Sequence, residues 1–321
     1  MVNKKVKENL VPKNKDTLPK SKDLKLTDLI SVFIDGYGKS QSNDGQKEFS
    51  EKLSLYLKQE VSKHPSSKDY NILVLFDNSI MVKGDSDQIY KAVTAFEDKN
   101  KPLVLVLVSG GGEPGSAYLI GKLCREFCNN KFIVVVPRHA KSAATLLSCA
   151  ANEIHMGSLS ELGPIDPQIN GMPTLGLKNS VEHIASLVTK NPGASEMFAR
   201  YLQRTIEPVQ IGYYERVAES LVQYAEKLLN KHVSTLKTSV SEIAEKLVYG
   251  YKDHGFVIDK EEATEIFGTD TIKNNTKEYK IGNTIYDVLS EIEECANYFD
   301  YNFYFIGSLD SKPSLMKRKK K

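Results

Sequence analysis

The chain has 321 residues, of which 40% are hydrophobic and 26% are charged, and its formal net charge is +2. This length allows one large domain or two modest ones with a substantial core, and the composition is that of an ordinary globular protein. The near-neutral charge gives no general electrostatic affinity for nucleic acid, so no nucleic-acid partner is expected.

The two ends of the chain are basic. Residues 1–26 carry eight lysines against three acids, and residues 317–321 are all lysine or arginine. Because residues 1–26 also lack an apolar period, they are predicted to be a disordered tail, and residues 311–321 are interpreted as a second basic tail. No segment approaches the ~20 apolar residues of a membrane helix, and no apolar core of a secretory signal follows the N-terminal lysines.

The four cysteines lack the spacing of a zinc site; they are Cys124, Cys128, Cys149 and Cys295. This cysteine usage is typical of a reducing compartment. We therefore expect a soluble, cytoplasmic protein without a metal ion.

The first elements follow the N-terminal tail. The apolar run Ile30–Ile34 is predicted to be a short buried strand, and a helix follows that has one apolar face. This face comprises Phe49, Leu53, Tyr56, Leu57 and Val61.

Strands and helices then alternate. Strands are predicted at 70–76, 103–108 and 132–136, and helices at 85–96, 116–127 and 142–150. The strands are continuously apolar, as in LVLVLV at 103–108, which indicates a sheet buried on both faces. Alternation of this kind predicts right-handed crossovers and an α/β core.

The remainder of the chain is mainly helical. Apolar spacing predicts helices at 180–189, 196–204, 213–229, 240–249 and 284–299, followed by a strand at 301–306.

A glycine turn, Ser109-Gly110-Gly111-Gly112, joins the 103–108 strand to the next helix. Glycines at the end of a strand leave backbone N–H groups open to a substrate carbonyl, and two such donors stabilise an oxyanion. The alternative is a tight turn that needs only positive φ. The turn also fits GxGxxG, the pattern of a dinucleotide-binding site. However, at least two strands precede the turn, and Arg138 stands where a NAD site would have an acidic residue. A NADP site remains a minor alternative.

Ser142 stands just past the third of these strands, at the start of a helix and before the small residues Ala143 and Ala144. A helix start favours negative charge on a serine oxygen or its adduct, as a nucleophile requires. By position alone, Ser142 would be interpreted as an N-cap.

The run from Leu103 to Ile169 resembles the ClpP/crotonase superfamily, and within it the SppA-like serine dehydrogenase proteinase family. The resemblance rests on SGGG at 109–112, PRHAKSAATLLSCAANEIHMG at 137–157, SELGPIDPQI at 160–169 and, more distantly, HGFVID at 254–259. It implies a spiral of parallel ββα units with a helical C-terminal extension used for oligomerisation. Gly110 replaces the proline of that family's usual SPGG turn.

The resemblance implies that Ser142 is the nucleophile of a serine peptidase acting on a peptide or protein substrate, without an organic cofactor. Gly111 and Gly112 would supply the oxyanion donors, and Ala143 is grouped with them in oxyanion and substrate binding. The position of a ClpP-like histidine holds Asp166, which would orient the base or shape the pocket.

The proton acceptor is the open question of the sequence. SppA-like enzymes take a lysine from further along, and Lys178 is the predicted base, provided that burial lowers its pKa. Lys190 is a second lysine candidate, while His139 and His254 are histidine candidates. Lys141, next to the nucleophile, is expected to pack or to face solvent.

The predicted organisation is a protease domain with its helical extension at 27–268 and a small C-terminal helix–strand element at 269–310. Two alternatives to a peptidase stay open: a catalytically inactive oligomeric peptide-binding scaffold and a crotonase-like acyl-CoA enzyme.

Overall fold

The computed structural model describes residues 23–38, 41–129, 131–169, 172–205 and 208–319. A nine-stranded sheet built from these residues has the order β11-β10-β1-β2-β3-β5-β9, and β4 and β6 form a short ladder beside β2. The strands of this sheet are β1 (Asn71–Asp77), β2 (Leu103–Ser109), β3 (Phe132–Val136), β4 (His139–Ala140), β5 (Glu153–Met156), β6 (Glu161–Leu162), β9 (Ile272–Lys273), β10 (Tyr301–Ser308) and β11 (Ser314–Lys317).

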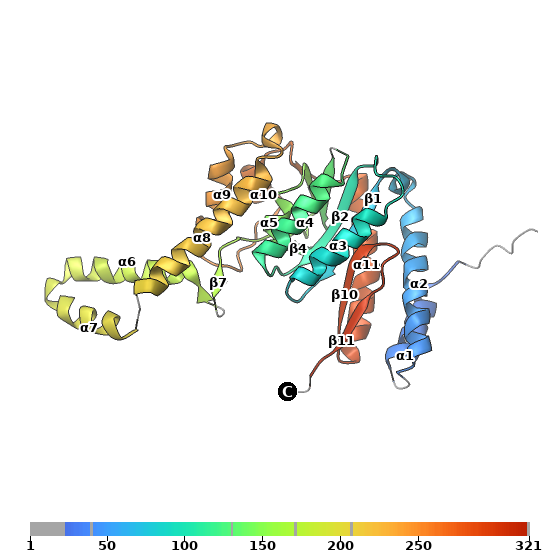
Figure 1. Cartoon of the computed structure of the whole chain (residues 1–321), viewed down its shortest axis with the longest axis horizontal. Coiled ribbons are helices and arrows are strands. Elements are labelled where there is room, and N and C mark those ends of the chain that lie inside the picture. The colour runs from blue at the N-terminus through green and yellow to red at the C-terminus, as the bar shows by residue number, and fades with distance from the viewer. Residues whose placement is uncertain (1–22, 39–40, 130, 170–171, 206–207, 320–321) are drawn as a thin grey trace, which may run out of the picture.

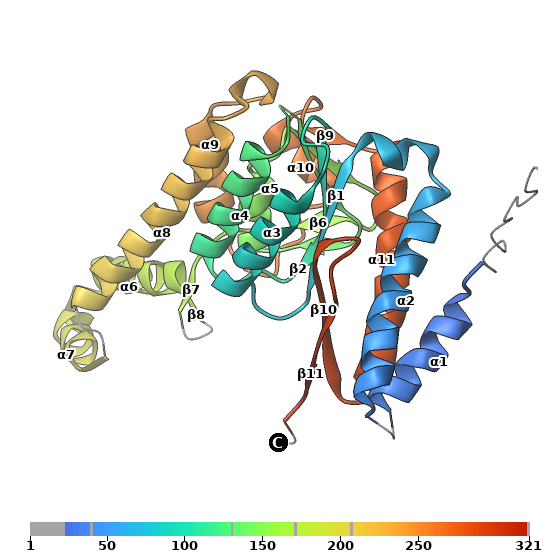
Figure 2. The ribbon, with the colours of Figure 1, turned by 45° about the vertical axis from the view of Figure 1, so that its right-hand side comes forward.

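Helices cover both faces of the sheet (Figures 1 and 2). The helices are α1 (Leu26–Tyr37), α2 (Asn43–Ser62), α3 (Lys83–Ala95), α4 (Pro114–Glu126), α5 (Ala143–Ser148), α6 (Thr174–Lys190), α7 (Ser195–Thr205), α8 (Pro208–Leu229), α9 (Val240–Tyr249), α10 (Lys260–Phe267) and α11 (Lys277–Tyr298). One hydrophobic core lies beneath α3, α4, α5, α8 and α9, and a second lies beneath α1, α2 and α11.

Strand β2 shows why its sequence is apolar throughout. Leu103, Leu105 and Leu107 belong to the first core, whereas Val104 and Val106 belong to the second. Successive side chains of a strand point to opposite faces, so a strand between two helical layers needs apolar residues at every position. The predicted α/β fold of ClpP/crotonase type is confirmed, including the parallel pairing of β1, β2, β3 and β5.

The strand predicted at Ile30–Ile34 is wrong, because these residues lie within α1. Leu29, Phe33 and Tyr37 recur every fourth residue and are buried together, which is the spacing of a helix face. The Phe33 ring lies against Phe49 of α2, with centroids 5.1 Å apart. The short apolar run satisfied both patterns, and packing against α2 selected the helix.

The C-terminal residues complete the sheet. Strand β10 pairs antiparallel with β1, and β11 pairs antiparallel with β10. Strand β9 extends the opposite edge by pairing with β5. Residues 269–310, predicted to be a small C-terminal element, therefore supply strands to the same sheet as the preceding residues.

Helices α6 and α7 form an arm that projects from the body, and α8 returns from it (Figure 1). The second half of α8 is anchored in the first core through Ala218, Leu221 and Ala225. In contrast, Met197 of α7 is 61% exposed and Val209 at the start of α8 is 80% exposed. None of the helices in the described part of the chain combines the length and apolar character needed to cross a lipid bilayer.

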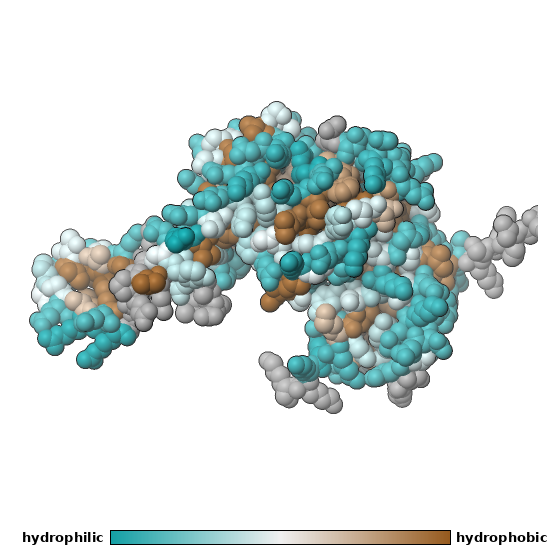
Figure 3. Space-filling view, in the orientation of Figure 1, coloured by the Kyte–Doolittle hydropathy of each residue, from teal (hydrophilic) through white to brown (hydrophobic). Residues whose placement is uncertain are grey.

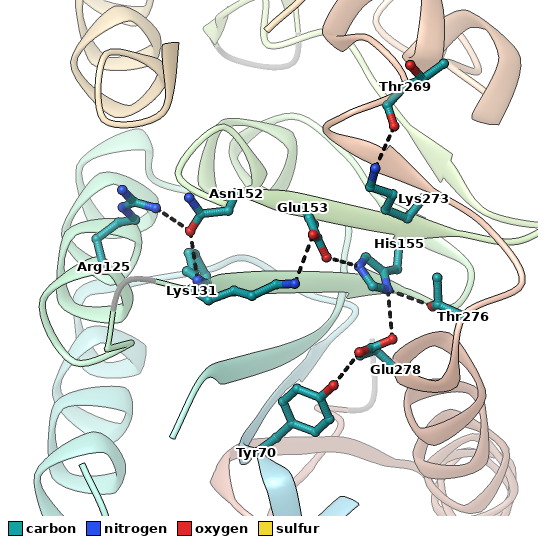
Figure 4. Close-up of polar contacts among 11 residues, drawn as sticks. Tyr70, Arg125, Lys131, Asn152, Glu153, His155, Thr269, Lys273, Thr276 and Glu278 are labelled. Carbon is teal, nitrogen blue, oxygen red and sulfur yellow. Dashed lines mark hydrogen bonds and ion pairs between the residues drawn. The ribbon is translucent and has the colours of Figure 1, made fainter. Parts of the chain in front are cut away.

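A buried polar network lies at the amino ends of the parallel strands (Figure 4). His155 is 1% exposed, and its Nε2 lies 3.0 Å from the Glu153 carboxylate. Its Nδ1 lies 2.7 Å from the hydroxyl of Thr276, the N-cap of α11, and 3.7 Å from Glu278. The Tyr70 hydroxyl donates to Glu278 from the other side. The network therefore ties α11 to the sheet, at the end opposite to the glycine turn.

Candidate active site

Ser142 has an unusual backbone conformation. Its φ is 51° and its ψ is −118°, outside the regions that residues with a side chain ordinarily occupy. The residue precedes α5, yet its hydroxyl makes no capping hydrogen bond to that helix. Strain of this kind persists only where the surrounding structure imposes it, and it concentrates at functional sites. The N-cap interpretation does not account for this serine.

Strand β4 brings Ser142 to the glycine turn. Ala140 pairs in parallel with Ser109, the last residue of β2, and the Lys141 N–H donates to the Ser109 carbonyl at 2.9 Å. Ser142 therefore lies at the carboxyl end of β2, where parallel sheets of open α/β proteins bind their ligands.

Two glycines of the turn have a positive φ, and neighbouring segments also lie too close to them to leave room for a side chain. Gly111 has φ 111°, and a β-carbon on it would lie 2.8 Å from the Ser142 β-carbon and 3.2 Å from the Ala143 nitrogen. Gly112 has φ 147°, and a β-carbon there would lie 2.3 Å from the Met81 nitrogen. Any side chain at either position would displace the Ser142 segment or the Met81 segment.

The backbone N–H groups around Ser142 differ in their availability. The Gly111 N–H already donates to the Ser109 hydroxyl at 3.1 Å. The N–H groups of Gly112 and Ala143 donate to no acceptor among the described residues. Of the three residues assigned to oxyanion binding, Gly112 and Ala143 thus present open donors, whereas Gly111 supplies space.

Asp166 and His254 form a pair that joins residues 88 positions apart. The Nδ1 atom of His254 lies 2.8 Å from Oδ1 of Asp166, and the other carboxylate oxygen accepts a hydrogen bond from Gln168 at 3.0 Å. The Asp166 side chain is 6% exposed and that of His254 is 34% exposed. The hydrogen bond to the Asp166 carboxylate, opposed by partial burial, raises the pKa of His254 above its usual 6.5.

A short ladder of three segments brings this pair to the same region as Ser142. Ala140 pairs in parallel with Leu162, and Leu162 pairs antiparallel with Ile258. The residues that follow Ala140, up to Ser142, leave the ladder at one end. Because Ile258 pairs antiparallel, the residues that precede it, back to His254, leave the ladder at the same end. Asp166 follows Leu162 at that end.

Lys141 fastens these segments together. Its ammonium lies 3.1 Å from Glu161 and donates to the carbonyls of Leu162 and Phe256, each at 3.3 Å. These contacts tie the segment before Ser142 to the segments of Leu162 and Phe256. A β-carbon on Gly163 would lie 2.7 Å from the Lys141 side chain, which explains the glycine there.

Thr145 is a bridging position beside Ser142 that the sequence did not reveal. Its buried hydroxyl donates to the Ala140 carbonyl at 2.6 Å and accepts the Gly163 N–H at 3.0 Å. This single group fixes the strand before Ser142 to the turn before Asp166. Only its place one helical turn after Ser142 could have suggested the role.

The other predicted bases lie elsewhere or outside the described atoms. Lys178 lies within α6, but its side chain is outside the described residues. Lys190 is exposed at the end of the same helix. His139 of β4 bonds through Nε2 to Asn78 at 2.8 Å, and burial lowers its pKa.

The guanidinium of Arg138, the residue considered for a NADP site, is held by α11. It lies 4.3 Å from the centre of the Tyr286 ring and donates to Asn283 at 2.8 Å. This position gives no support to a NADP site at the glycine turn.

One family model matches more than half of the chain. The model of the ClpP-like SDH-type serine proteinase family matches residues 75–279, more than half of the chain. Two relatives are known as uncharacterized proteins of Methanocaldococcus jannaschii. MJ0137 is 28% identical over 194 residues, which is 60% of this chain and 61% of the relative. MJ1495 is 30% identical over 93 residues, which is 29% of this chain and 31% of the relative. The chain therefore spans less than two thirds of the length of either relative.

Two solved structures are similar to the chain. One is a serine-to-alanine mutant of the 1510-N membrane-bound stomatin-specific protease, with a TM-score of 0.42, 13% identity, and coverage of 71% of this chain and 84% of that chain. The other is a lysine-to-alanine mutant of the same protease in complex with a substrate peptide, with a TM-score of 0.42, 14% identity, and coverage of 65% and 77%.

Proposed function

The chain belongs to the family of ClpP-like SDH-type serine proteinases, and on this premise we propose that it is a serine peptidase whose nucleophile is Ser142. The observation that carries the proposal is the backbone of Ser142, held at φ 51° with its hydroxyl uncapped and packed against Gly111. Holding a nucleophile in one geometry lowers the entropic part of the barrier to attack.

In the proposed reaction, Ser142 Oγ attacks the carbonyl carbon of a peptide bond and loses its proton to a base. The carbonyl electrons move to the oxygen, which the N–H groups of Gly112 and Ala143 stabilise; each such donor is worth about 3 kcal/mol in acyl transfer. Collapse of this intermediate breaks the C–N bond and the amine leaves with a proton. Water then hydrolyses the acyl-enzyme.

The base expected from the resemblance is Lys178, with Asp166 orienting it or shaping the pocket. The start of α6 follows the Asp166 segment after a few residues, which supports a position near the site. A lysine there would need burial to lower its pKa before it could accept the serine proton.

We further propose that the protein is a homo-oligomer assembled through the arm. Hydrophobic surface is visible on the arm of α6 and α7 (Figure 3). Met197 of α7 and, at the start of α8, Val209 and Tyr213 are all more than half exposed. Exposed apolar groups in this density are typical of an interaction surface.

A serine-reactive fluorophosphonate tests the proposed function. We expect covalent labelling of the wild-type protein and none of Ser142→Ala, with Ser148→Ala as the matched control on the buried side of α5. If the wild-type oligomer is not labelled, the protein is a peptide-binding scaffold instead. Saturable binding of a CoA thioester that Ser142→Ala does not impair would favour a crotonase-like enzyme.

A further inference from the structure

The sequence leaves the proton acceptor for Ser142 open, and the structure brings together one pair that suits this role. His254 and Asp166 are the histidine and the carboxylate that meet at the end of the ladder carrying Ser142. We propose that His254 is the catalytic base and that Asp166 is the positioning residue that orients its imidazole. The inference rests on the proposed function of Ser142.

The hydrogen bond to Asp166 decides which nitrogen is available. A carboxylate accepts, so Nδ1 of His254 carries the proton and donates it to Asp166 across 2.8 Å. In the neutral imidazole, Nε2 then holds the lone pair, as a general base requires. The second Asp166 oxygen is engaged by Gln168, which fixes the plane of the carboxylate.

The ladder sets the distance over which the base must act. Ser142 and His254 leave from two segments separated by the Leu162 segment, and neighbouring strands lie about 4.8 Å apart, so the two backbone paths are about 10 Å apart. The two side chains and a hydrogen bond between them can span this separation. No hydrogen bond joins Ser142 Oγ to His254 Nε2 among the described residues, and catalytic hydrogen bonds often tighten only when substrate binds.

Backbone contacts hold His254 in this region. Phe256, two residues after His254, accepts a hydrogen bond from Lys141, the residue before Ser142. The Leu162 N–H donates to the Ile258 carbonyl at 2.8 Å, and the Ile258 N–H donates back at 3.1 Å. The histidine loop therefore cannot move away without breaking contacts to the nucleophile segment.

In the step assigned to His254, the Oγ–H bond of Ser142 breaks and the proton passes to Nε2 while Oγ bonds to the carbonyl carbon. The imidazolium is stabilised by Asp166 and then returns the proton to the leaving amine. The charged groups around the imidazole are Asp166, Asp253 and Lys141. Lys141 is in turn paired with Glu161.

The test measures the rate constant of Ser142 labelling by a fluorophosphonate between pH 5 and pH 9 in the full chain. For His254→Ala we expect a decrease of about 10²–10⁴-fold and loss of the rise in rate with pH that a histidine base produces. For Asp166→Asn we expect a smaller decrease and a rise that occurs at lower pH, because the carboxylate that raises the histidine pKa is gone. The matched control is His64→Gln, whose ring bonds to Thr284 near the amino ends of the strands.

Each other outcome overturns the inference in a distinguishable way. If His254→Ala keeps the wild-type rate and pH profile while Ser142→Ala is not labelled, the proposed function stands and the base is another group. Loss of labelling in Lys178→Ala alone would identify that lysine. If the wild-type protein is not labelled, both proposals fail. Thermal unfolding separates a misfolded variant from an inactive one, and His254→Gln serves as a second variant that keeps size and polarity.

Discussion

The Cα of Gly111 faces Ser142 so closely that a β-carbon on the glycine would lie 2.8 Å from that of the serine. The Ser142 segment and the glycine turn are thus in direct contact. Neither segment can shift without the other, and this coupling makes the site sensitive to the smallest substitutions.

Gly111→Ala is expected to lower the labelling rate of Ser142 by about 100-fold, because displacement by about 1 Å misaligns the attacking oxygen. The positive φ at this position adds a loss of stability of roughly 1–3 kcal/mol. Labelling kinetics and the free energy of unfolding measure the two effects. Gly115→Ala is the control, since a β-carbon there meets nothing within 4 Å; equal behaviour of both variants would contradict the coupling.

Thr145→Val is expected to destabilise the protein by roughly 1–3 kcal/mol, because the buried Gly163 N–H loses its acceptor. The same change should slow labelling of Ser142, whereas Thr145→Ser should restore both properties because its hydroxyl can still bridge the two segments. Chemical denaturation and labelling kinetics provide the measurements. The half-buried Thr94→Val serves for comparison, and a Thr145→Ser protein as slow as Thr145→Val would refute the bridging role.

The lowered pKa of the Glu153 carboxyl group predicts that the protein loses stability in acid. Hydrogen bonding to His155 and the nearby Lys131 lower its pKa from 4.5 to about 2. A carboxyl group with a lowered folded-state pKa stabilises the fold above its unfolded value and loses this contribution as the pH falls. The free energy of unfolding should therefore decrease between about pH 4.5 and pH 2 in the wild type, and less steeply in Glu153→Gln. Glu97→Gln, at an exposed site, should follow the wild-type curve; parallel curves for all three proteins would count against the network.

The exposed apolar residues of the arm and of the start of α8 lead to a prediction about the oligomeric state. Charged residues in the proposed contact, as in Met197→Glu combined with Val209→Glu, should lower the oligomeric state because they place unpaired charge in an apolar interface. Sedimentation velocity measures this state, and circular dichroism reports whether the helices persist. Leu55→Glu is the control, because Leu55 is 62% exposed on α2, far from the arm in Figure 1. A wild-type protein that sediments as a monomer would rule out the assembly.

The sequence by itself determined the features that depend on local pattern. Continuous apolar runs such as Leu103–Val108 can be satisfied only between two helical layers, so strands β1, β2 and β3 were predicted correctly. The long amphipathic helices were predicted for the same reason, since a 3.6-residue period is visible along the chain. The motifs around Gly111 and Ser142 are local as well, and they were sufficient to suggest the family.

Only the tertiary structure decided the features that depend on distant partners. Ile30–Ile34 is helical because α2 offers a matching face, which a five-residue run cannot reveal. The Gly111 N–H is engaged because the Ser109 side chain turns back toward it. The contact between Asp166 and His254 closes a loop of 88 residues, and no periodicity encodes such a contact. Local periods follow from side-chain spacing along one segment, whereas the chemistry of this site follows from which segments the sheet brings to the same edge.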